Sequence, residues 1–233
     1  MQPVDPPALT ISGSGWRESK WLAICELCLV GLIFVAARFH LIYFSKTPYL
    51  LIVAWVSLRL RNVRWREVGL SVHRNWPMTL ALGIGLGFLT EAFQLLVTQP
   101  VLAAWIGKQP DLSVFNALKG NIPLMLLGIA FSWTLAAVGE ELVFRGYLLN
   151  RVADLGGRTR WAWIASALVV TAVFGLSHSG QGSTGMIEEG IAGLWLTLIY
   201  FGMGRNLLVP IVAHGVQDTI DVVLIYFDKF PGM

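Results

Sequence analysis

Two adjacent glutamates and an arginine stand out because they lie in an apolar part of the sequence. Glu140, Glu141 and Arg145 follow residues 122–138, which contain no charged residue. A charged side chain near the centre of a bilayer costs at least about 2.5–3.5 kcal/mol, so such groups normally face a protein interior or a wet cavity. These three residues therefore predict a polar site inside an apolar protein.

A helix would give the two glutamates different surroundings. Glu141 and Arg145 are four residues apart and share a face, where they can form an ion pair. Glu140 is rotated by about 100° from Glu141 and has no such partner along the helix. The spacing therefore predicts a structural role for Glu141 and leaves Glu140 for chemistry.

Two histidines and an aspartate add to this set. His178 ends one apolar segment, and His214 and Asp218 lie four residues apart on a later one. A partly desolvated glutamate is a suitable general base for water, and a histidine beside it can hold that water and later protonate a leaving amine. A second histidine can stabilise a tetrahedral oxyanion. Together with Glu140, these residues predict hydrolysis of a peptide bond by activated water.

The same residue types leave a metal site open. Two histidines and two carboxylates can bind a divalent metal such as zinc, but the sequence lacks the H-E-x-x-H spacing of zincins. We therefore expect no cofactor, with zinc as the alternative. Cys25 and Cys28 have the C-x-x-C spacing, but no neighbour completes a metal site. We expect both to be small core residues of a helix.

The composition identifies the class of protein. Of 233 residues, 55% are apolar and 13% are charged, whereas a soluble domain has about 25% charged residues. The long apolar runs predict transmembrane helices. The expected fold is an all-α polytopic membrane protein with about seven to eight transmembrane helices. The net charge of +3 is small, and no dense Lys/Arg run predicts a nucleic-acid partner.

The apolar segments define the expected spans. They cover residues 21–37, 49–60, 78–97, 122–152, 161–177, 187–203 and 206–227. The longest of them, 122–152, reads as one helix with Pro123 in its first turn, where proline is tolerated. Residues 99–120 are expected to form a polar connection with a short surface helix.

Four other acids lie on or beside these segments. Glu26 and Glu91 have no companion motif, and we expect each to hydrogen-bond to a neighbouring helix. Glu188 and Glu189 are expected at the membrane edge, in the first turn of a helix, where acids suit the helix dipole.

Three regions are expected along the chain. Residues 1–20 are predicted to be a flexible tail, 21–120 to hold the N-terminal spans and a basic loop, and 121–228 to form the catalytic core. Placing the N-terminus in the cytoplasm puts most of the 17 basic residues on the inner side, as the positive-inside rule requires. These are Arg17, Lys20, Arg59, Arg61, Arg64, Arg66, Arg74, Arg145, Arg151, Arg158, Arg160 and Arg205.

Three motifs resemble those of a known family. Glu140-Glu141-x-x-x-Arg145, Phe174-x-x-x-His178 and His214-x-x-x-Asp218 are similar, in type and order, to motifs of the CAAX protease and bacteriocin-processing family. This family of intramembrane endopeptidases includes the Ras-converting CAAX prenyl endopeptidases. Each motif alone is weak, but three in order on apolar segments are specific. The resemblance covers roughly residues 122–221.

The resemblance implies a helical membrane core around a catalytic cavity that faces the cytoplasm. It implies a glutamate-type endopeptidase without a metal, in which Glu140 and His178 activate water. The family's oxyanion-stabilising histidine and asparagine map to His214 and Asp218, and Glu141 and Arg145 map to a supporting ion pair. The implied substrate is a protein or peptide near the membrane surface, such as the C-terminal tripeptide of a prenylated protein. We expect a multi-pass protein of a bacterial or archaeal plasma membrane, in contact with lipids.

One position departs from the prenyl endopeptidases, because Asp218 stands where they have asparagine. An ionised aspartate cannot donate a hydrogen bond to an oxyanion. Our hypothesis is that Asp218 orients His214 and favours its imidazolium form, and higher activity of Asp218→Asn would contradict it. If the helices are straight, Glu140 and His178 lie about 20–25 Å from the inner membrane face but His214 only about 10–13 Å.

Two readings without catalysis stay open. The chain could be a scaffold or a bacteriocin-immunity membrane protein that retains the motifs. It could also be a transporter that uses the acids as a proton relay. A transporter of this kind predicts two pseudo-repeat halves, and the sequence shows no internal repeat.

Overall fold

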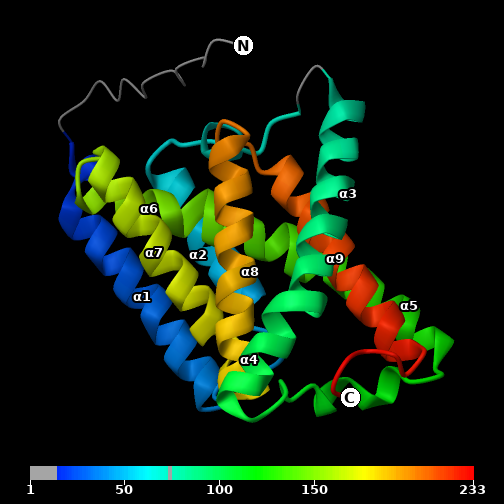
Figure 1. Ribbon diagram of the computed structural model, residues 1–233. Coiled ribbons are helices and arrows are strands. Elements are labelled where there is room, and N and C mark those ends of the chain that lie inside the picture. Colours follow the sequence, from blue (N-terminus) through cyan, green and yellow to red (C-terminus); the bar gives the residue numbers. More distant parts are fainter. Residues whose placement is uncertain (1–14, 73–74) are drawn as a thin grey trace.

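The computed structural model describes residues 15–72 and 75–233, and every regular element within them is a helix (Figure 1). The α-helices are α1 (Lys20–Arg38), α2 (Thr47–Leu60), α3 (Trp76–Phe93), α4 (Gln99–Ile106), α5 (Ile122–Phe131), α6 (Leu149–Leu155), α7 (Arg160–Leu176), α8 (Gly182–Gly202) and α9 (Leu208–Tyr226). The expected all-α polytopic fold is confirmed. Most of the predicted N-terminal tail, and Arg74 of the basic loop, lie outside the described residues.

Short helical segments of other types join or separate these helices. Three are π-helical, namely Gln94–Thr98, Ser132–Glu140 and Leu142–Leu148, and four are 3₁₀ turns, namely Trp16–Glu18, Trp65–Val68, Ser113–Leu118 and Ser179–Gln181. The π-helical segments lie inside longer helices and do not end them. As a result α5 and α6 belong to one continuous helix, Ile122–Leu155, as the sequence predicts.

The boundary expected near Gln99 is wrong. Helix α3 continues through a π-helical segment into α4, so that Trp76–Ile106 is one helix of 31 residues. Pro100 does not end it because it falls in the first turn of α4, which follows the π-helical segment. The connection to α5 therefore begins only at Gly107.

Four helices in the described part of the chain are long and apolar enough to cross a membrane. Helices α7 and α8 meet at an angle of 53°, and counting them as one broken span gives five. The predicted number of seven to eight is therefore not confirmed. One reason is α2, which has 14 residues and covers only about 21 Å at 1.5 Å per residue.

Glycines bring the helices that carry the histidines close to their neighbours. A Cβ atom on Gly83 of α3 would lie 2.5 Å from the Cβ of Val212 on α9, and Gly87 makes the same kind of approach one turn later. A Cβ atom on Gly175 of α7 would lie 2.5 Å from the carbonyl oxygen of Met186 on α8. Small residues that allow close backbone approach are typical of helix interfaces in membranes.

The outward faces of the helices are rich in large apolar side chains, such as Leu89, Trp105 and Leu168. Cys25 and Cys28 also lie on such a face, because both are exposed on α1. The expectation that they are core residues is therefore wrong. In a membrane protein, an apolar face can be directed at lipid as well as at the protein interior, and composition does not separate the two.

Candidate active site

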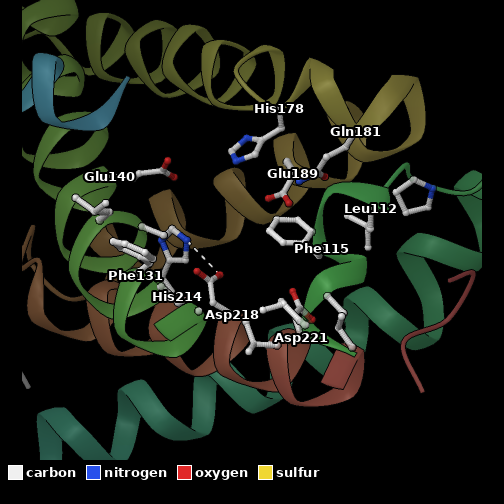
Figure 2. Close-up of a pocket in the computed structure, with 18 of the residues that line it drawn as sticks. Leu112, Phe115, Phe131, Glu140, His178, Gln181, Glu189, His214, Asp218 and Asp221 are labelled. Atoms are coloured by element: carbon white, nitrogen blue, oxygen red, sulfur yellow. Dashed lines mark ion pairs between the residues drawn. The ribbon is translucent and has the colours of Figure 1, made fainter. Parts of the chain in front are cut away.

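A cavity of about 420 Å³ lies among the long helix, α8, α9 and the connections at one end of the molecule (Figure 2). Its polar and charged lining residues are Ser45, Thr47, Gln94, Ser132, Glu140, His178, Gln181, Glu188, Glu189, His214, Asp218 and Asp221. Its apolar wall includes Phe44, Leu112, Phe115, Leu118, Phe131, Leu135, Val222, Ile225 and Phe230. The four residues predicted to be catalytic all line this one cavity.

The glutamate pair lies where two π-helical segments meet. Glu140 ends the segment Ser132–Glu140, and the next begins at Leu142. π-Helical turns are rare and occur frequently at functional sites. Gly139 lets α2 approach at this point, because a Cβ atom there would lie 2.8 Å from the Cγ2 atom of Thr47. The backbone around the pair is thus irregular and closely packed.

Glu140 is nearly buried, with 7% of its surface exposed, and it borders the cavity. The hydroxyl of Thr47 on α2 lies 3.5 Å from its Oε1 atom, which makes a long hydrogen bond. Within the described residues, this is the one protein hydrogen bond to the Glu140 carboxylate. The carboxylate therefore has acceptor capacity left for a water molecule in the cavity.

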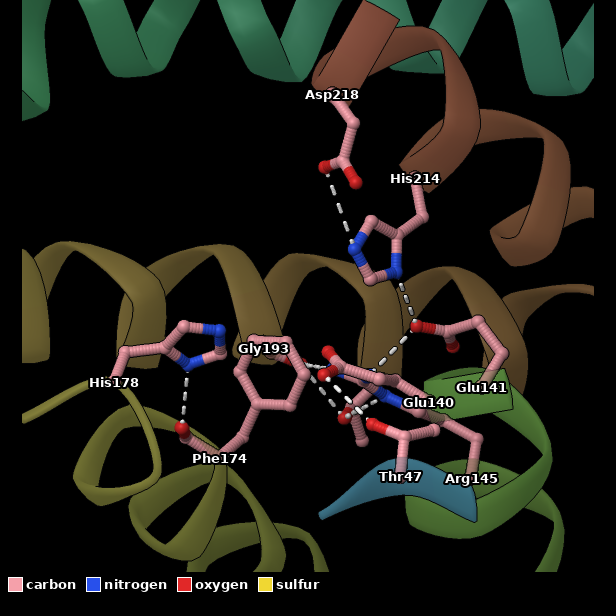
Figure 3. Close-up of polar contacts among 10 residues, drawn as sticks. Thr47, Glu140, Glu141, Arg145, Phe174, His178, Gly193, His214 and Asp218 are labelled. Carbon is pink, nitrogen blue, oxygen red and sulfur yellow. Dashed lines mark hydrogen bonds and ion pairs between the residues drawn. The ribbon is translucent and has the colours of Figure 1, made fainter. Parts of the chain in front are cut away.

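Glu141 points away from the cavity and forms the predicted ion pair with Arg145. Arg145 Nη1 lies 2.7 Å from Glu141 Oε1, and both side chains are fully buried. Arg145 Nη2 also donates to the carbonyl oxygen of Gly193 at 2.6 Å. Its guanidinium lies 4.7 Å from the centre of the Phe174 ring, which is a favourable cation–π distance. The pair thus joins the long helix to α7 and α8 (Figure 3).

His214 connects the ion pair to the cavity (Figure 3). Its Nδ1 atom lies 3.0 Å from Glu141 Oε1, and its Nε2 atom lies 3.5 Å from Asp218 Oδ1. An ionised carboxylate only accepts hydrogen bonds, so Nδ1 carries a proton and donates to Glu141. Nε2 is then the ring atom directed toward Asp218, at the side that lines the cavity.

His178 lies just after α7 and is fixed by the chain that precedes it. Its Nδ1 atom lies 2.9 Å from the carbonyl oxygen of Phe174 and 3.2 Å from the Ser177 hydroxyl. A carbonyl oxygen only accepts, so Nδ1 donates to it. In the neutral ring, Nε2 then has no proton and can accept one. Phe174 also packs its ring 4.9 Å from the His178 ring.

Straight helices would place His214 at a different membrane depth from Glu140 and His178. In the structure, the three residues nevertheless line the same cavity. Figure 2 shows Glu140, His178, His214 and Asp218 around the same space. Helix α9 is inclined relative to α8 (Figure 1), and its residues therefore do not lie at the depths that straight helices would give them. The Glu141–His214 contact joins the long helix Ile122–Leu155 directly to α9.

Some acids at or near the cavity have positions that the sequence did not predict. Glu188 and Glu189 lie beyond the first turn of α8 and line the cavity, because α8 begins at Gly182. Glu91 is buried, yet neither of its carboxylate oxygens has a hydrogen-bond partner in the described structure. Its neighbour on another helix is the carboxyl group of Asp221 on α9, so the expected contact between helices is present without a well-formed hydrogen bond. Asp221, one turn after Asp218, also borders the cavity.

The expectation for Glu26 agrees with the structure. Its two oxygens each lie 3.2 Å from a guanidinium nitrogen of Arg61, at the end of α2. Two other residues at the site were not predicted from their types or spacing. Thr47 is one of them, and Phe174, although part of a motif, had no predicted role. Threonine and phenylalanine do not by themselves indicate a catalytic site. Both residues act through contacts between helices that are far apart in the sequence.

The cavity lies at the end of the helices opposite the arginine-rich connections. Its lining includes residues of the connections 39–46, 107–121 and 177–181. The arginines of the connections 61–72 and 156–159, and Arg205, lie at the other ends of the same helices. A cytoplasmic position for these arginines and a cavity that faces the cytoplasm therefore cannot both be right.

Within residues 15–72 and 75–233, no three His, Cys, Asp or Glu side chains converge as a metal-binding group. His214 and Asp218 face each other, but Glu141 is held by Arg145. The zinc alternative requires such a convergence.

The comparisons with known proteins give one match. A family model described as Type II CAAX prenyl endopeptidase Rce1-like matches residues 122–220. No curated protein and no solved structure matches the chain. The matched residues contain all three motifs, and the match confirms the resemblance that they carry. Together with the apolar helices, it identifies the chain as an integral membrane protein.

Proposed function

We propose that this chain is an active intramembrane endopeptidase, because its residues 122–220 match the family model of Rce1-like type II CAAX prenyl endopeptidases. The observation that carries the proposal is the convergence of Glu140, His178, His214 and Asp218 on one cavity. Glu140, His178 and His214 come from three different motifs that lie far apart in the sequence, and a shared site accounts for their convergence. A scaffold or immunity protein would have no need of this arrangement.

Glu140 and His178 have the properties needed to activate water. The Glu140 carboxylate, with only the long Thr47 contact, can accept a proton from a water molecule in the cavity. The water oxygen then attacks the carbonyl carbon of the scissile peptide bond and forms a tetrahedral oxyanion. When the C–N bond breaks, the proton passes to the leaving amine, directly from Glu140 or through His178 Nε2.

His214 is placed to stabilise the oxyanion. Its Nδ1 proton is engaged by Glu141 at 3.0 Å, so only an Nε2–H group can point to the oxyanion. This requires the imidazolium form, which the two neighbouring carboxylates of Glu141 and Asp218 stabilise by charge attraction. Asp218, at 3.5 Å from Nε2, would hold the ring in place until substrate binds. The proposed role of Asp218 is therefore to position His214.

The test is cleavage of quenched peptides by the purified protein in detergent, with and without a strong chelator. The peptides are a farnesylated CAAX peptide and a set of non-prenylated apolar peptides. The proposal expects cleavage that survives chelation and is absent from Glu140→Ala. Activity that is lost to chelation and restored by zinc would support the metal alternative. If the protein cleaves neither this peptide nor non-prenylated apolar peptides, the scaffold reading becomes the better one.

The side of the membrane at which cleavage occurs follows from the charge distribution. The arginine-rich connections have the composition of cytoplasmic loops, and the cavity lies at the opposite end. We therefore propose that the cavity opens on the extracytoplasmic side. A C-terminal tripeptide of a cytoplasmic prenylated protein would then be out of reach, and an exported or membrane-inserted peptide would be the natural substrate.

Cysteine labelling tests this orientation. In a Cys25→Ser/Cys28→Ser background, Ser113→Cys near the cavity is expected to react with a membrane-impermeant maleimide on intact cells. Val72→Cys, in the arginine-rich connection, is expected to react only after permeabilisation. Both native residues are exposed, so access should depend on the membrane alone. The reverse labelling pattern would place the cavity in the cytoplasm and favour prenylated substrates.

A further inference from the structure

Two groups of acids contrast in this protein. Glu26 and Glu141 are buried and each is paired with an arginine, and Asp154 is paired with Arg151 and Arg158. Asp111 and Asp228, outside the membrane-spanning helices, also have partners: hydrogen bonds from Ser113 and from Lys119 lower their pKa values. The second group has no basic partner in the described structure and lies at the cavity.

This second group comprises Glu188, Glu189 and Asp221, which we call the acidic wall. All three residues line the cavity, and no Lys or Arg is among the described lining residues. Glu188 is 4% exposed, and its Oε1 atom has no hydrogen-bond partner in the described structure. The Oδ1 atom of Asp221 also has no hydrogen-bond donor there, and it lies beside another acid, Glu91. Figure 2 shows Glu189 and Asp221 beyond Asp218, along the same cavity.

Unpaired carboxylates at a buried site are costly unless something compensates them. A buried charge normally has a partner of opposite charge or hydrogen bonds to all its polar atoms. The acidic wall borders a cavity large enough for a peptide side chain. The missing partner can therefore come from the molecule that enters the cavity.

The surroundings favour an organic cation over a metal ion. No three metal-ligating side chains converge in the part of the chain that the structure describes, so the carboxyl groups are spread along the wall. Leu112, Phe115 and Phe230 face the same cavity. Such side chains can cover the aliphatic stem of a lysine or arginine, and an aromatic face attracts its charged end.

We propose that the acidic wall binds a lysine or arginine side chain of the peptide substrate, close to the scissile bond. This inference rests on the proposed endopeptidase function and specifies its substrate class as cationic peptides with apolar segments. The same wall disfavours a substrate whose C-terminal carboxylate must lie beside it, because like charges repel. Release of a C-terminal tripeptide would require a C-terminal carboxylate to enter the cavity.

A measurement of peptide binding tests this inference without requiring cleavage. Three short, fluorescent, apolar peptides are compared that differ only at one central residue, which is lysine, norleucine or glutamate. Their affinities are measured by fluorescence anisotropy with the full-length Glu140→Gln protein in detergent, which keeps the peptides intact. The lysine peptide is expected to bind about 10- to 100-fold more tightly than the norleucine peptide, and the glutamate peptide most weakly. The preference should decrease with added salt.

Two variants locate the preference. Glu188→Gln/Glu189→Gln in the same background is expected to remove most of the discrimination between lysine and norleucine. Asp111→Asn is the matched control, since it removes a negative charge that has its own partners and is not a lining residue. Should the double variant fail to fold, Glu189→Gln alone, at a half-buried position, serves instead. Equal affinities for lysine and norleucine in the parent protein would overturn the inference.

Cleavage of the same peptides by the protein with Glu140 intact distinguishes the two proposals. Cleavage without any preference for lysine would contradict the acidic wall as a binding site and leave the endopeptidase standing. A preference for lysine without cleavage of any peptide would support the binding site and count against the endopeptidase. Cleavage with a preference for lysine is the expected result.

Discussion

Replacing Glu140 with glutamine is expected to lower kcat/KM by about 10²- to 10⁴-fold, the usual contribution of a general base. Glutamine has the same shape, and its amide oxygen can still accept the hydrogen bond from Thr47. It cannot take a proton from water. The measurement is the initial rate of peptide cleavage in detergent at substrate concentrations below KM.

The control is Glu67→Gln, which changes an exposed glutamate outside the cavity in the same way. It should leave both the rate and the melting temperature unchanged. Glu140→Gln should also keep the parent melting temperature, because its side chain has no ion pair to lose. Full activity of Glu140→Gln would exclude Glu140 as the base, and a fall in its melting temperature would mean that lost activity reflects folding.

Replacing Arg145 with methionine is expected to destabilise the protein by about 3–5 kcal/mol, because it leaves the buried Glu141 carboxylate without its main partner. The variant also loses the hydrogen bond that Arg145 donates to the Gly193 carbonyl oxygen and the contact of Arg145 with the Phe174 ring. The measurement is thermal unfolding of the purified variant in detergent. Arg66→Met, at an exposed position, is the matched control and should change stability by less than about 0.5 kcal/mol.

The double variant Glu141→Gln/Arg145→Met separates the charge from the packing. Removing both charges is expected to recover part of the stability, since no unpaired carboxylate is then buried. His214 would still lose a charged partner, so cleavage should remain weak even where folding is restored. If Arg145→Met is as stable as the parent, the ion pair is not what joins the long helix to α7 and α8.

Local spacing was sufficient to predict the features that depend on one helix. The Glu141–Arg145 pair, the long helix from Ile122 and the Asp218–His214 contact all follow from a separation of four residues or from an apolar run. The convergence of the three motifs on one cavity was expected from the chemistry of their residues and from the resemblance, and not from local spacing. It depends on how α9 is inclined and how α2 reaches Gly139, which no local pattern contains.

The features that were not predicted depend on whether a side chain faces outward from the protein or faces its interior. Cys25 and Glu188 both lie on mostly apolar helices, yet one faces outward and the other faces the cavity. Hydropathy treats lipid and protein interior alike, and so it did not separate them. The π-helical segments around Glu140 were also not predicted, since the same residues would form a regular α-helix. Helix packing decides these points, and the sequence alone does not give it.

The length of α2 bears on how water reaches the peptide bond. This helix of 14 residues spans about 21 Å, against about 30 Å for the hydrocarbon core of a bilayer. It begins at Thr47, the residue that contacts Glu140. A hydrophobic stretch that is too short draws the lipid headgroups inward and thins the bilayer locally. The polar surface of the membrane would thus descend to the level of the glutamate, and an enzyme of this kind would work faster in short-chain lipids than in long-chain ones.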